Sequence, residues 1–309
     1  MPSRLPILFY HRVLERPDPL VPDAPDIRRF DIHMSTLARF CRVVSLDEGV
    51  ARLLDGRLRS RTVCITFDDG YRDNYLHALP VLRRHRLTSS FFIATGFLDG
   101  GRMFCDTVIE AVRRFPPGEI DLEWFGLGRR MVGDVASRIR LIDELTGRIK
   151  YLDLEQRNDA CDRLAALAAS PLPDDLMMRS EHVREMHHAG MTIGGHTVDH
   201  PILCSIANAE ARRQVVANRE ALANISDAMP RFFAYPNGKP GTDYGLEHVR
   251  MVREAGYSSA LTTVWGSAVP SSDLFQLPRI APWQHSPARF AAGLVRAVCS
   301  RRAAGVVNL

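Results

Sequence analysis

The fold is best read from the segment Thr62-Val63-Cys64-Ile65-Thr66-Phe67-Asp68-Asp69-Gly70. Its first six residues are apolar, β-branched or aromatic, a composition that predicts a fully buried strand. Two adjacent carboxylates and a glycine close that strand. Two neighbouring negative charges are costly unless something positive holds one of them. A divalent metal ion would do so, with one aspartate as ligand and the other free to accept a proton; a surface turn is the alternative interpretation.

Strand-like and helix-like segments alternate on both sides of this stretch, which indicates parallel strands with helices outside them. We therefore expect an α/β fold of the (β/α) barrel kind. The expected strands are 5–10, 42–45, 62–67, 90–94, 191–194, 231–234, 258–261 and 275–280, and the expected helices are 31–41, 46–54, 75–84, 180–189, 208–225, 246–255 and 287–301.

The alternation stops between about residues 105 and 178. Helical periodicity with few strand signals covers this segment, over 108–115, 135–145 and 154–169, and proline-rich turns separate the helices. We predict a mainly helical insertion or cap at 105–178 within a single domain that spans 1–309. Asp106 is interpreted as a helix N-cap, with a place in a substrate cleft as the alternative.

The composition is that of an ordinary folded protein. The chain has 309 residues, 46% of them hydrophobic, and 40 basic against 36 acidic side chains give a formal net charge of +4. The arginines are scattered and no block of like charge occurs, so we expect no nucleic-acid partner. No run of 18 apolar residues exists, so we expect no transmembrane segment. The oligomeric state stays open.

The cysteines indicate a reducing compartment. The six of them are widely spaced, form no C-x-x-C pair and lie partly inside apolar runs, as expected for buried free thiols. Residues 1–6 are too few for a basic segment followed by an apolar secretory segment. We therefore expect a cytoplasmic protein.

A second polar cluster, His196-Thr197-Val198-Asp199-His200-Pro201, follows the strand-like segment that ends in Gly194-Gly195. Histidines at i and i+4 can converge from one helical turn on a metal ion, and the two glycines would let the chain turn sharply into it. An isolated histidine pair is more often a surface feature. Together with one aspartate of the Asp68-Asp69 pair, however, the set suits Zn²⁺ or a similar ion and leaves one coordination position open.

A third cluster, Phe233-Ala234-Tyr235-Pro236-Asn237-Gly238, also follows an apolar strand. A proline–glycine loop there can present backbone N–H groups to a developing oxyanion, although such a loop is usually only a turn. In a parallel barrel the carboxyl ends of the strands gather the reactive groups. The three clusters are therefore expected to meet at that end.

In this order the clusters T-F-D-D-G, H-T-x-x-H-P and F-x-Y-P-x-G resemble motifs of the polysaccharide deacetylase family, the carbohydrate esterases (family 4) with the NodB homology domain. The resemblance spans most of the chain outside 105–178, and the segments 9–13 and 275–280 resemble a bacterial branch. It implies a distorted (β/α) barrel of about seven to eight parallel strands. It also implies a hydrolase of non-peptide C–N bonds that removes acetyl groups from N-acetylated sugars with one divalent metal ion, expected to be Zn²⁺.

The resemblance assigns roles residue by residue. Asp68 would be the general base, and Asp69, His196 and His200 would be the metal ligands. The backbone N–H of Asn237 would help to form an oxyanion hole. The loop that carries it comprises Tyr235, Pro236, Asn237 and Gly238.

Two departures from the family pattern leave roles to be filled. Many members have an arginine that braces the base where this chain has Ala234, and we predict that Arg279 replaces it; a structural or surface arginine is the alternative. The aspartate-containing fourth motif and the L-x-x-H motif that supplies the usual general acid are not evident. We predict His11 as the acid, since it follows the first strand, with His285 as the second candidate. Both could instead be core or rim histidines.

The sequence thus predicts a metal-dependent deacetylase of an N-acetylated sugar in a polysaccharide, a glycolipid or a precursor of either. A related amide hydrolase acting on a non-sugar C–N bond is one alternative. A carbohydrate-binding homologue that has lost turnover is another, although the intact Asp68, Asp69, His196 and His200 argue against it. The sugar remains undefined.

Overall fold

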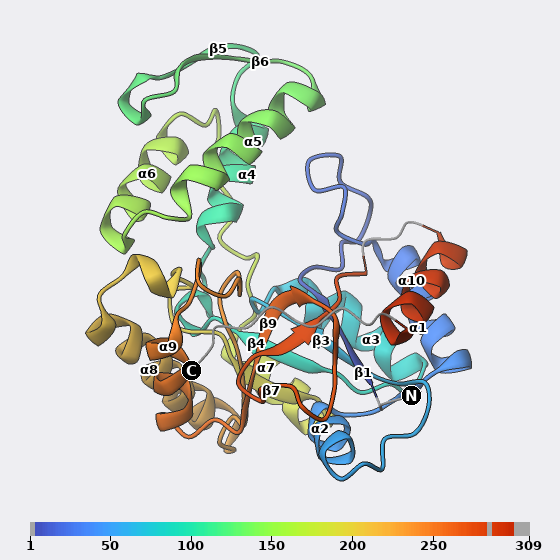
Figure 1. Cartoon of the computed structure of the whole chain (residues 1–309). Coiled ribbons are helices and arrows are strands. Elements are labelled where there is room, and N and C mark those ends of the chain that lie inside the picture. The colour runs from blue at the N-terminus through green and yellow to red at the C-terminus, as the bar shows by residue number, and fades with distance from the viewer. Residues whose placement is uncertain (1–3, 283–285, 300–309) are drawn as a thin grey trace.

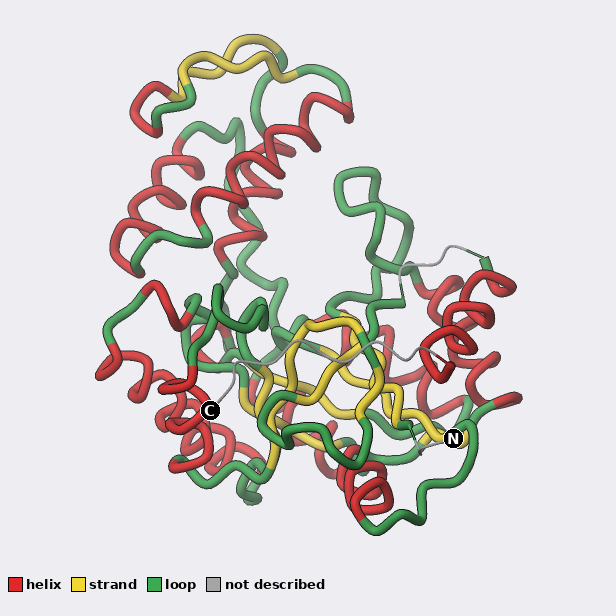
Figure 2. Tube along the Cα trace, viewed as in Figure 1, coloured by secondary structure: helices red, strands yellow, loops and turns green. Residues whose placement is uncertain are grey.

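A parallel sheet that closes on itself forms the centre of the structure, a computed structural model that describes residues 4–282 and 286–299 (Figures 1 and 2). Within these residues the parallel strands follow the order β1-β3-β4-β7-β8-β9-β11. Ile280, just after β11, bridges back to Leu8 of β1, and its N–H donates to the carbonyl of Ile7 over 2.8 Å. The expected barrel of about seven to eight parallel strands is therefore confirmed. The bounds are β1 Leu5–Tyr10, β3 Thr62–Phe67, β4 Ser90–Ile93, β7 Thr192–Gly195, β8 Phe232–Ala234, β9 Ser259–Trp265 and β11 Leu277–Arg279, with the short strands β2 Arg42–Val43 beside β3 and β10 Ser267–Ala268 antiparallel to β1.

The alternating side chains of the strands build two cores, because successive Cβ atoms point to opposite faces of a sheet. One cluster joins side chains from β1, β3, β4, β8, β9 and β11, including Ile7, Cys64, Phe92 and Leu277, and fills the inside of the barrel. Helix α2 packs against this cluster and covers the amino-terminal end of the strands. A larger cluster on the outer face of β1, β3 and β4 is covered by surrounding helices.

The helices around the barrel largely match the expected segments. The predicted helix 75–84 instead begins as a π-helical turn, Asn74–Ala78, that leads into α3. The bounds are α1 Ile27–Phe40, α2 Leu46–Leu54, α3 Leu79–Arg84, α7 Ser180–His188, α8 Asn208–Ser226, α9 Leu246–Glu254 and α10 Pro287–Cys299.

The segment between β4 and α7 forms a separate layer that stands above the barrel, on the side away from α2 (Figure 1). It has its own hydrophobic cluster. It contains a β-hairpin in addition to the predicted helices. The signal was present, because in β5 the buried Ile120 and Leu122 alternate with the exposed Glu119 and Asp121. The bounds are α4 Phe104–Arg114, β5 Gly118–Leu122, β6 Gly128–Val132, α5 Val135–Ile149 and α6 Leu154–Ala166.

Five cysteines are free thiols: Cys41, Cys64, Cys105, Cys161 and Cys204. The expectation that they are buried fails for Cys204, which is exposed. In the part of the chain that the structure describes, no helix combines the length and the apolar character needed to cross a membrane.

Candidate active site

The first two polar clusters meet at the carboxyl ends of β3 and β7. Oδ1 of Asp69 lies 3.3 Å from Nε2 of His196 and 3.5 Å from Nε2 of His200. One ligand atom from each of the three residues falls within 4.8 Å of the others, and all three residues are buried. The structure therefore brings together the three metal ligands that the sequence resemblance implied.

The two histidines converge by a different route from the one expected. Residues 196–200 form an irregular loop rather than a helical turn. Thr197 and His200 adopt positive φ angles of 64° and 50° in this loop, and Asp69 has a φ of 78°. Such angles are unfavourable for residues other than glycine and persist where surrounding contacts enforce them. The loop conformation is thus imposed by its surroundings.

Gly194 and Gly195 serve close packing rather than the sharp turn that was predicted. Neither glycine has a positive φ. A Cβ atom on Gly195 would lie 2.1 Å from the hydroxyl oxygen of Tyr257, and one on Gly194 would lie 2.6 Å from the ring of Phe92. These glycines allow the strand that leads to His196 to approach its neighbours.

The donor set fits a divalent metal ion. Oδ1 of Asp69 is buried and has no hydrogen-bond partner among the residues that the structure describes. Nδ1 of His196 lies 2.7 Å from the carbonyl oxygen of Ala234, so it must donate its proton there. In the neutral imidazole Nε2 is then the nitrogen whose lone pair can bind an ion beside Asp69. One carboxylate and two imidazoles are suitable ligands for Zn²⁺ and related ions, and three protein ligands leave a position for water or substrate.

The electrostatics of the cluster favour an ionised Asp69 and a neutral His200, whereas for His196 the contact with Asp69 and the charges of Asp68 and Asp69 outweigh burial and raise the pKa. Burial raises the pKa of Asp69, but the surrounding imidazoles, led by His196, outweigh this effect and hold its pKa well below the usual range. Burial and the neighbouring His196 lower the pKa of His200 to about 3. His200 is consequently a neutral imidazole at ordinary pH.

Asp68 and Arg279 form a buried pair beside this cluster. Nη1 and Nη2 of Arg279 each donate to one carboxylate oxygen of Asp68, both over 2.7 Å. Nε of Arg279 donates to the carbonyl oxygen of Thr262, and the guanidinium lies 4.6 Å from the ring centroid of Phe9. Arg279 is fully buried and Asp68 is 2% exposed. The arginine thus occupies the inside of the barrel and fixes both oxygens of Asp68.

This pair controls the charge of Asp68. Burial raises the pKa of its carboxyl group, but the charge and hydrogen bonds of Arg279 outweigh burial and hold the pKa below the usual value. Asp68 is therefore ionised at neutral pH, as a proton acceptor must be.

His11 follows β1 at the same end of the barrel and is exposed. It lies close enough to Asp68 and Asp69 for its charge to lower the pKa of both. Its carbonyl oxygen accepts a hydrogen bond from Nδ2 of Asn74 over 2.8 Å. The structure thus places His11 in the neighbourhood of the two aspartates, whereas His285 lies outside the described residues.

The third cluster forms a tight loop after β8. Asn237 has a φ of 56°, and no acceptor within residues 4–282 and 286–299 is paired with its backbone N–H. Gly238 has a φ of 69°, and a Cβ there would lie 2.9 Å from the backbone nitrogen of Thr263. The ring of Tyr235 stacks on Tyr244 at 3.9 Å and belongs to a hydrophobic cluster. The ring of Tyr235 therefore anchors the loop. Because the backbone N–H of Asn237 is not used within the described structure, it is available to donate to a bound substrate.

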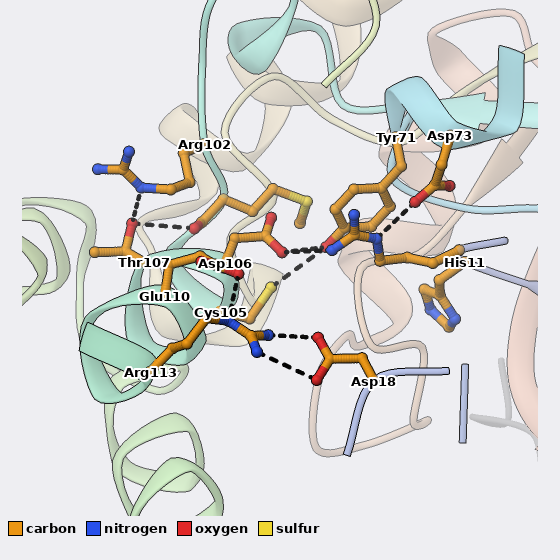
Figure 3. A network of polar contacts seen from close by, with 12 residues as sticks. His11, Asp18, Tyr71, Asp73, Arg102, Cys105, Asp106, Thr107, Glu110 and Arg113 are labelled. Atoms are coloured by element: carbon orange, nitrogen blue, oxygen red, sulfur yellow. Dashed lines mark hydrogen bonds and ion pairs between the residues drawn. The ribbon is translucent and has the colours of Figure 1, made fainter. Parts of the chain in front are cut away.

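A further polar network ties α4 to the segment after β1 (Figure 3). Arg12 donates from Nε to Asp73 over 2.8 Å, and its Nη1 lies 3.8 Å from Oδ1 of Asp106. The hydroxyl of Tyr71 donates to the same Asp106 oxygen over 3.2 Å. A second contact between the two segments, from Arg113 to Asp18, is drawn in the same view. Since Arg12 is next to His11, the network restrains the segment that carries His11.

The prediction that Asp106 caps a helix is wrong. Met103 occupies the N-cap of α4, and Asp106 lies in the first turn and is 2% exposed. No group in the described part of the chain hydrogen-bonds its Oδ2. Burial raises the pKa of Asp106 from 3.8 to about 7, and the nearby Arg12 reduces the effect only in part. Asp106 therefore carries a buried negative charge only at neutral pH and above.

Replacing Asp106 with asparagine should change the pH dependence of stability. A carboxyl group with a raised pKa in the folded state contributes stability below pH 4, and that contribution is lost as the pH rises through about 7. Asp106→Asn should thus match the wild type at pH 4 and exceed it at pH 8, by up to roughly 4 kcal/mol. Urea unfolding of chelator-treated protein between pH 4 and 8 measures the difference.

The exposed Asp175, paired with Arg72, supplies the control. In Asp175→Asn the free energy of unfolding should depend on pH as it does in the wild type. If the free energies of unfolding of Asp106→Asn and the wild type differ by the same amount at every pH between 4 and 8, Asp106 is not a buried titrating acid.

Several residues that position the site were missed from the sequence. Gln214 and Asn218 of α8 are fully buried and hydrogen-bond the backbone of residues 196–199. Their signal was available, because two amides spaced i, i+4 on the buried side of a helix need polar partners. Asn74, which holds the carbonyl of His11, and Arg157, a buried residue of α6, gave no such signal.

With this geometry established, comparison identifies the family. The sequence profile of the polysaccharide deacetylase family matches residues 55–121 and 153–260, more than half of the chain. The chain belongs to this family, and the resemblance seen in the sequence is confirmed. The matched residues include Asp68, Asp69, His196 and His200; they exclude His11 and Arg279.

Individual relatives are distant. YxkH of Bacillus subtilis (strain 168), assigned to the polysaccharide deacetylases, is 21% identical over 281 residues, which cover 90% of this chain and 71% of YxkH. The deacetylase PplD of Streptococcus pyogenes, solved with acetate, superposes with a TM-score of 0.63 at 18% identity, over 96% of this chain and 99% of PplD. IcaB from Ammonifex degensii gives a TM-score of 0.60 at 19% identity, over 96% and 98%. These two structures share the fold.

Proposed function

We propose that this chain is a metal-dependent deacetylase that hydrolyses the N-acetyl group of an N-acetylated sugar in a polysaccharide, a glycolipid or a precursor of either. One observation carries the proposal: the Asp69–His196–His200 cluster lies beside a second aspartate, Asp68, whose carboxylate is held by Arg279. Membership of the polysaccharide deacetylase family supports the chemical class.

Asp69, His196 and His200 would hold the ion, for which we propose Zn²⁺. The ion would supply Lewis-acid activation of water and of the acetyl carbonyl. The fixed carboxylate of Asp68 would accept the proton of the attacking water as general base. The unpaired N–H of Asn237 would donate to the oxyanion that develops on the carbonyl.

His11 would donate the proton that the leaving amine needs. Its exposure at the barrel mouth gives it access to substrate, and its proximity to Asp68 and Asp69 puts it beside the reacting groups. The contacts of Asn74 and the Arg12 network would hold the backbone of this segment in place.

Acetate release from a panel of N-acetylated sugars, sugar polymers and sugar lipids tests the proposal. We expect release from at least one of them, and a loss of at least about 100-fold after chelation, restored by added Zn²⁺, because the ion activates both water and carbonyl. Parallel assays on simple non-sugar acetamides test the alternative amide hydrolase. Activity that resists chelation would contradict the metal mechanism, and sugar binding without any release would favour a non-catalytic homologue.

The segment 105–178 would act as a cap on a single barrel domain and shape the substrate cleft. Its separate hydrophobic cluster supports this division, and the family match skips residues 122–152 inside it. We further propose that the chain works in the cytoplasm, which its free thiols support. Cell fractionation that finds it only outside the cytoplasm would contradict this placement.

A further inference from the structure

We propose that Arg157, on α6 of the layer above the barrel, is a positioning residue for the metal ligand His200. Its Nη1 donates to the carbonyl oxygen of His200 over 3.0 Å, and its Nη2 donates to that of Asp199 over 2.6 Å. The inference rests on the proposed metal site. It assigns to the inserted layer a part in building that site, beyond shaping a substrate cleft.

The loop needs such restraint because its conformation is unfavourable on its own. Thr197 and His200 both adopt the left-handed region, which costs on the order of 1 kcal/mol or more for each non-glycine residue. Gln214 and Asn218 of α8 hold the loop from one side, through the backbone of residues 196–199. These contacts stop one residue short of His200.

Arg157 supplies the missing restraint from the other side. No other donor in the described part of the chain reaches the carbonyl oxygen of His200. The two histidine ligands also differ in their rings: Nδ1 of His196 is fixed by the carbonyl of Ala234, whereas Nδ1 of His200 has no partner within residues 4–282 and 286–299. Metal-binding histidines usually gain their orientation from a hydrogen bond at the second ring nitrogen. For His200 the restraint acts through the backbone instead.

The burial of Arg157 argues that its place is specific. The residue is 3% exposed, and its guanidinium lies 5.2 Å from the ring centroid of Phe104. Its Nε has no hydrogen-bond partner in the described structure. None of the ion pairs found among the described residues includes it. Burying an arginine without a carboxylate is costly, and here the two charge-assisted hydrogen bonds to loop carbonyls offset the cost.

Metal titration of the metal-free protein tests the proposal without any substrate. Arg157→Met, of similar length but without donors, should weaken the binding of Zn²⁺ about 10- to 100-fold, the range typical of residues that support metal ligands. Arg157→Lys, which can reach one carbonyl at a time, should fall between Arg157→Met and the wild type. The absorption spectrum of the Co²⁺-loaded protein should change in Arg157→Met, because His200 is displaced.

Arg163→Met is the matched control, since this arginine lies on the same helix with 54% of its side chain exposed. It should leave the affinity for Zn²⁺ and the Co²⁺ spectrum unchanged. Thermal unfolding of each metal-free variant separates a local effect from a general loss of structure; if Arg157→Met does not fold, Arg157→Lys carries the test.

Equal affinity for Zn²⁺ in the wild type and in Arg157→Lys and Arg157→Met would overturn the role of Arg157 and leave the proposed function standing. Tighter binding in Arg157→Met would overturn it too, because repulsion by the arginine charge would then outweigh the restraint. A wild type that binds Zn²⁺ but releases no acetate from any N-acetylated substrate would overturn the proposed function. The comparison of Zn²⁺ affinity between the wild type and the Arg157 variants would still test the role of Arg157.

Discussion

Asp68→Asn should lower kcat for acetate release by about 10²- to 10⁴-fold, the usual contribution of a general base, while the affinity for Zn²⁺ stays within a few-fold of the wild type. The amide keeps the shape of the carboxylate but cannot accept a proton. The proposed metal ligands Asp69, His196 and His200 are untouched by the change. Steady-state kinetics and metal titration of the same preparation measure the two effects.

The neighbouring Asp69 gives the sharpest comparison. Asp69→Asn should also abolish turnover, but through weaker metal binding, since its Oδ1 is the buried oxygen that faces both histidines. Asp159→Asn, at an exposed surface ion pair, should change neither quantity. If Asp68→Asn folds, binds Zn²⁺ and turns over at the wild-type rate, Asp68 is not the base.

The sequence was sufficient to predict the site where chemistry depends on residue type and order. Asp68, Asp69, His196 and His200 follow buried strands, and parallel strands bring their carboxyl ends to one edge whatever the details of the loops. Arg279 could be predicted because the family pattern left an arginine role unfilled, and the structure places it against Asp68. These features depend on topology, which strand and helix periodicity specify well.

The features that could not be predicted depend on contacts between segments far apart in the chain. Nothing in the residues around Arg157 shows that it reaches a loop 42 residues away. The reason for Gly195 is the hydroxyl of Tyr257, which only the packing of the folded chain reveals. The burial of Asp106 likewise follows from how α4 docks on the barrel. Local sequence patterns do not predict which distant residues will be in contact in the folded chain.

Replacing Arg279 with methionine should cost about 3–5 kcal/mol of stability at neutral pH, because it leaves the charge of Asp68 buried and unpaired. The same change should lower kcat, since Asp68 would lose both hydrogen bonds that fix its oxygens. Urea unfolding and acetate-release kinetics measure these losses. Arg212→Met, which breaks an ion pair whose two side chains are about half exposed, should cost less than about 1 kcal/mol.

The double variant Asp68→Asn/Arg279→Met separates the structural from the catalytic role of the pair. Removing both charges leaves no unpaired ion in the barrel, so the double variant should be more stable than Arg279→Met alone, as buried pairs replaced together often are. Turnover should remain lost, because no base is present. Recovery of stability in the double variant would show that Arg279 balances the charge of Asp68, and a lowered kcat in Arg279→Met, in which the carboxylate is retained, would show that it also orients that carboxylate. If the double variant loses the summed stability of the two single variants, the two side chains are not coupled, and the role assigned to Arg279 is wrong.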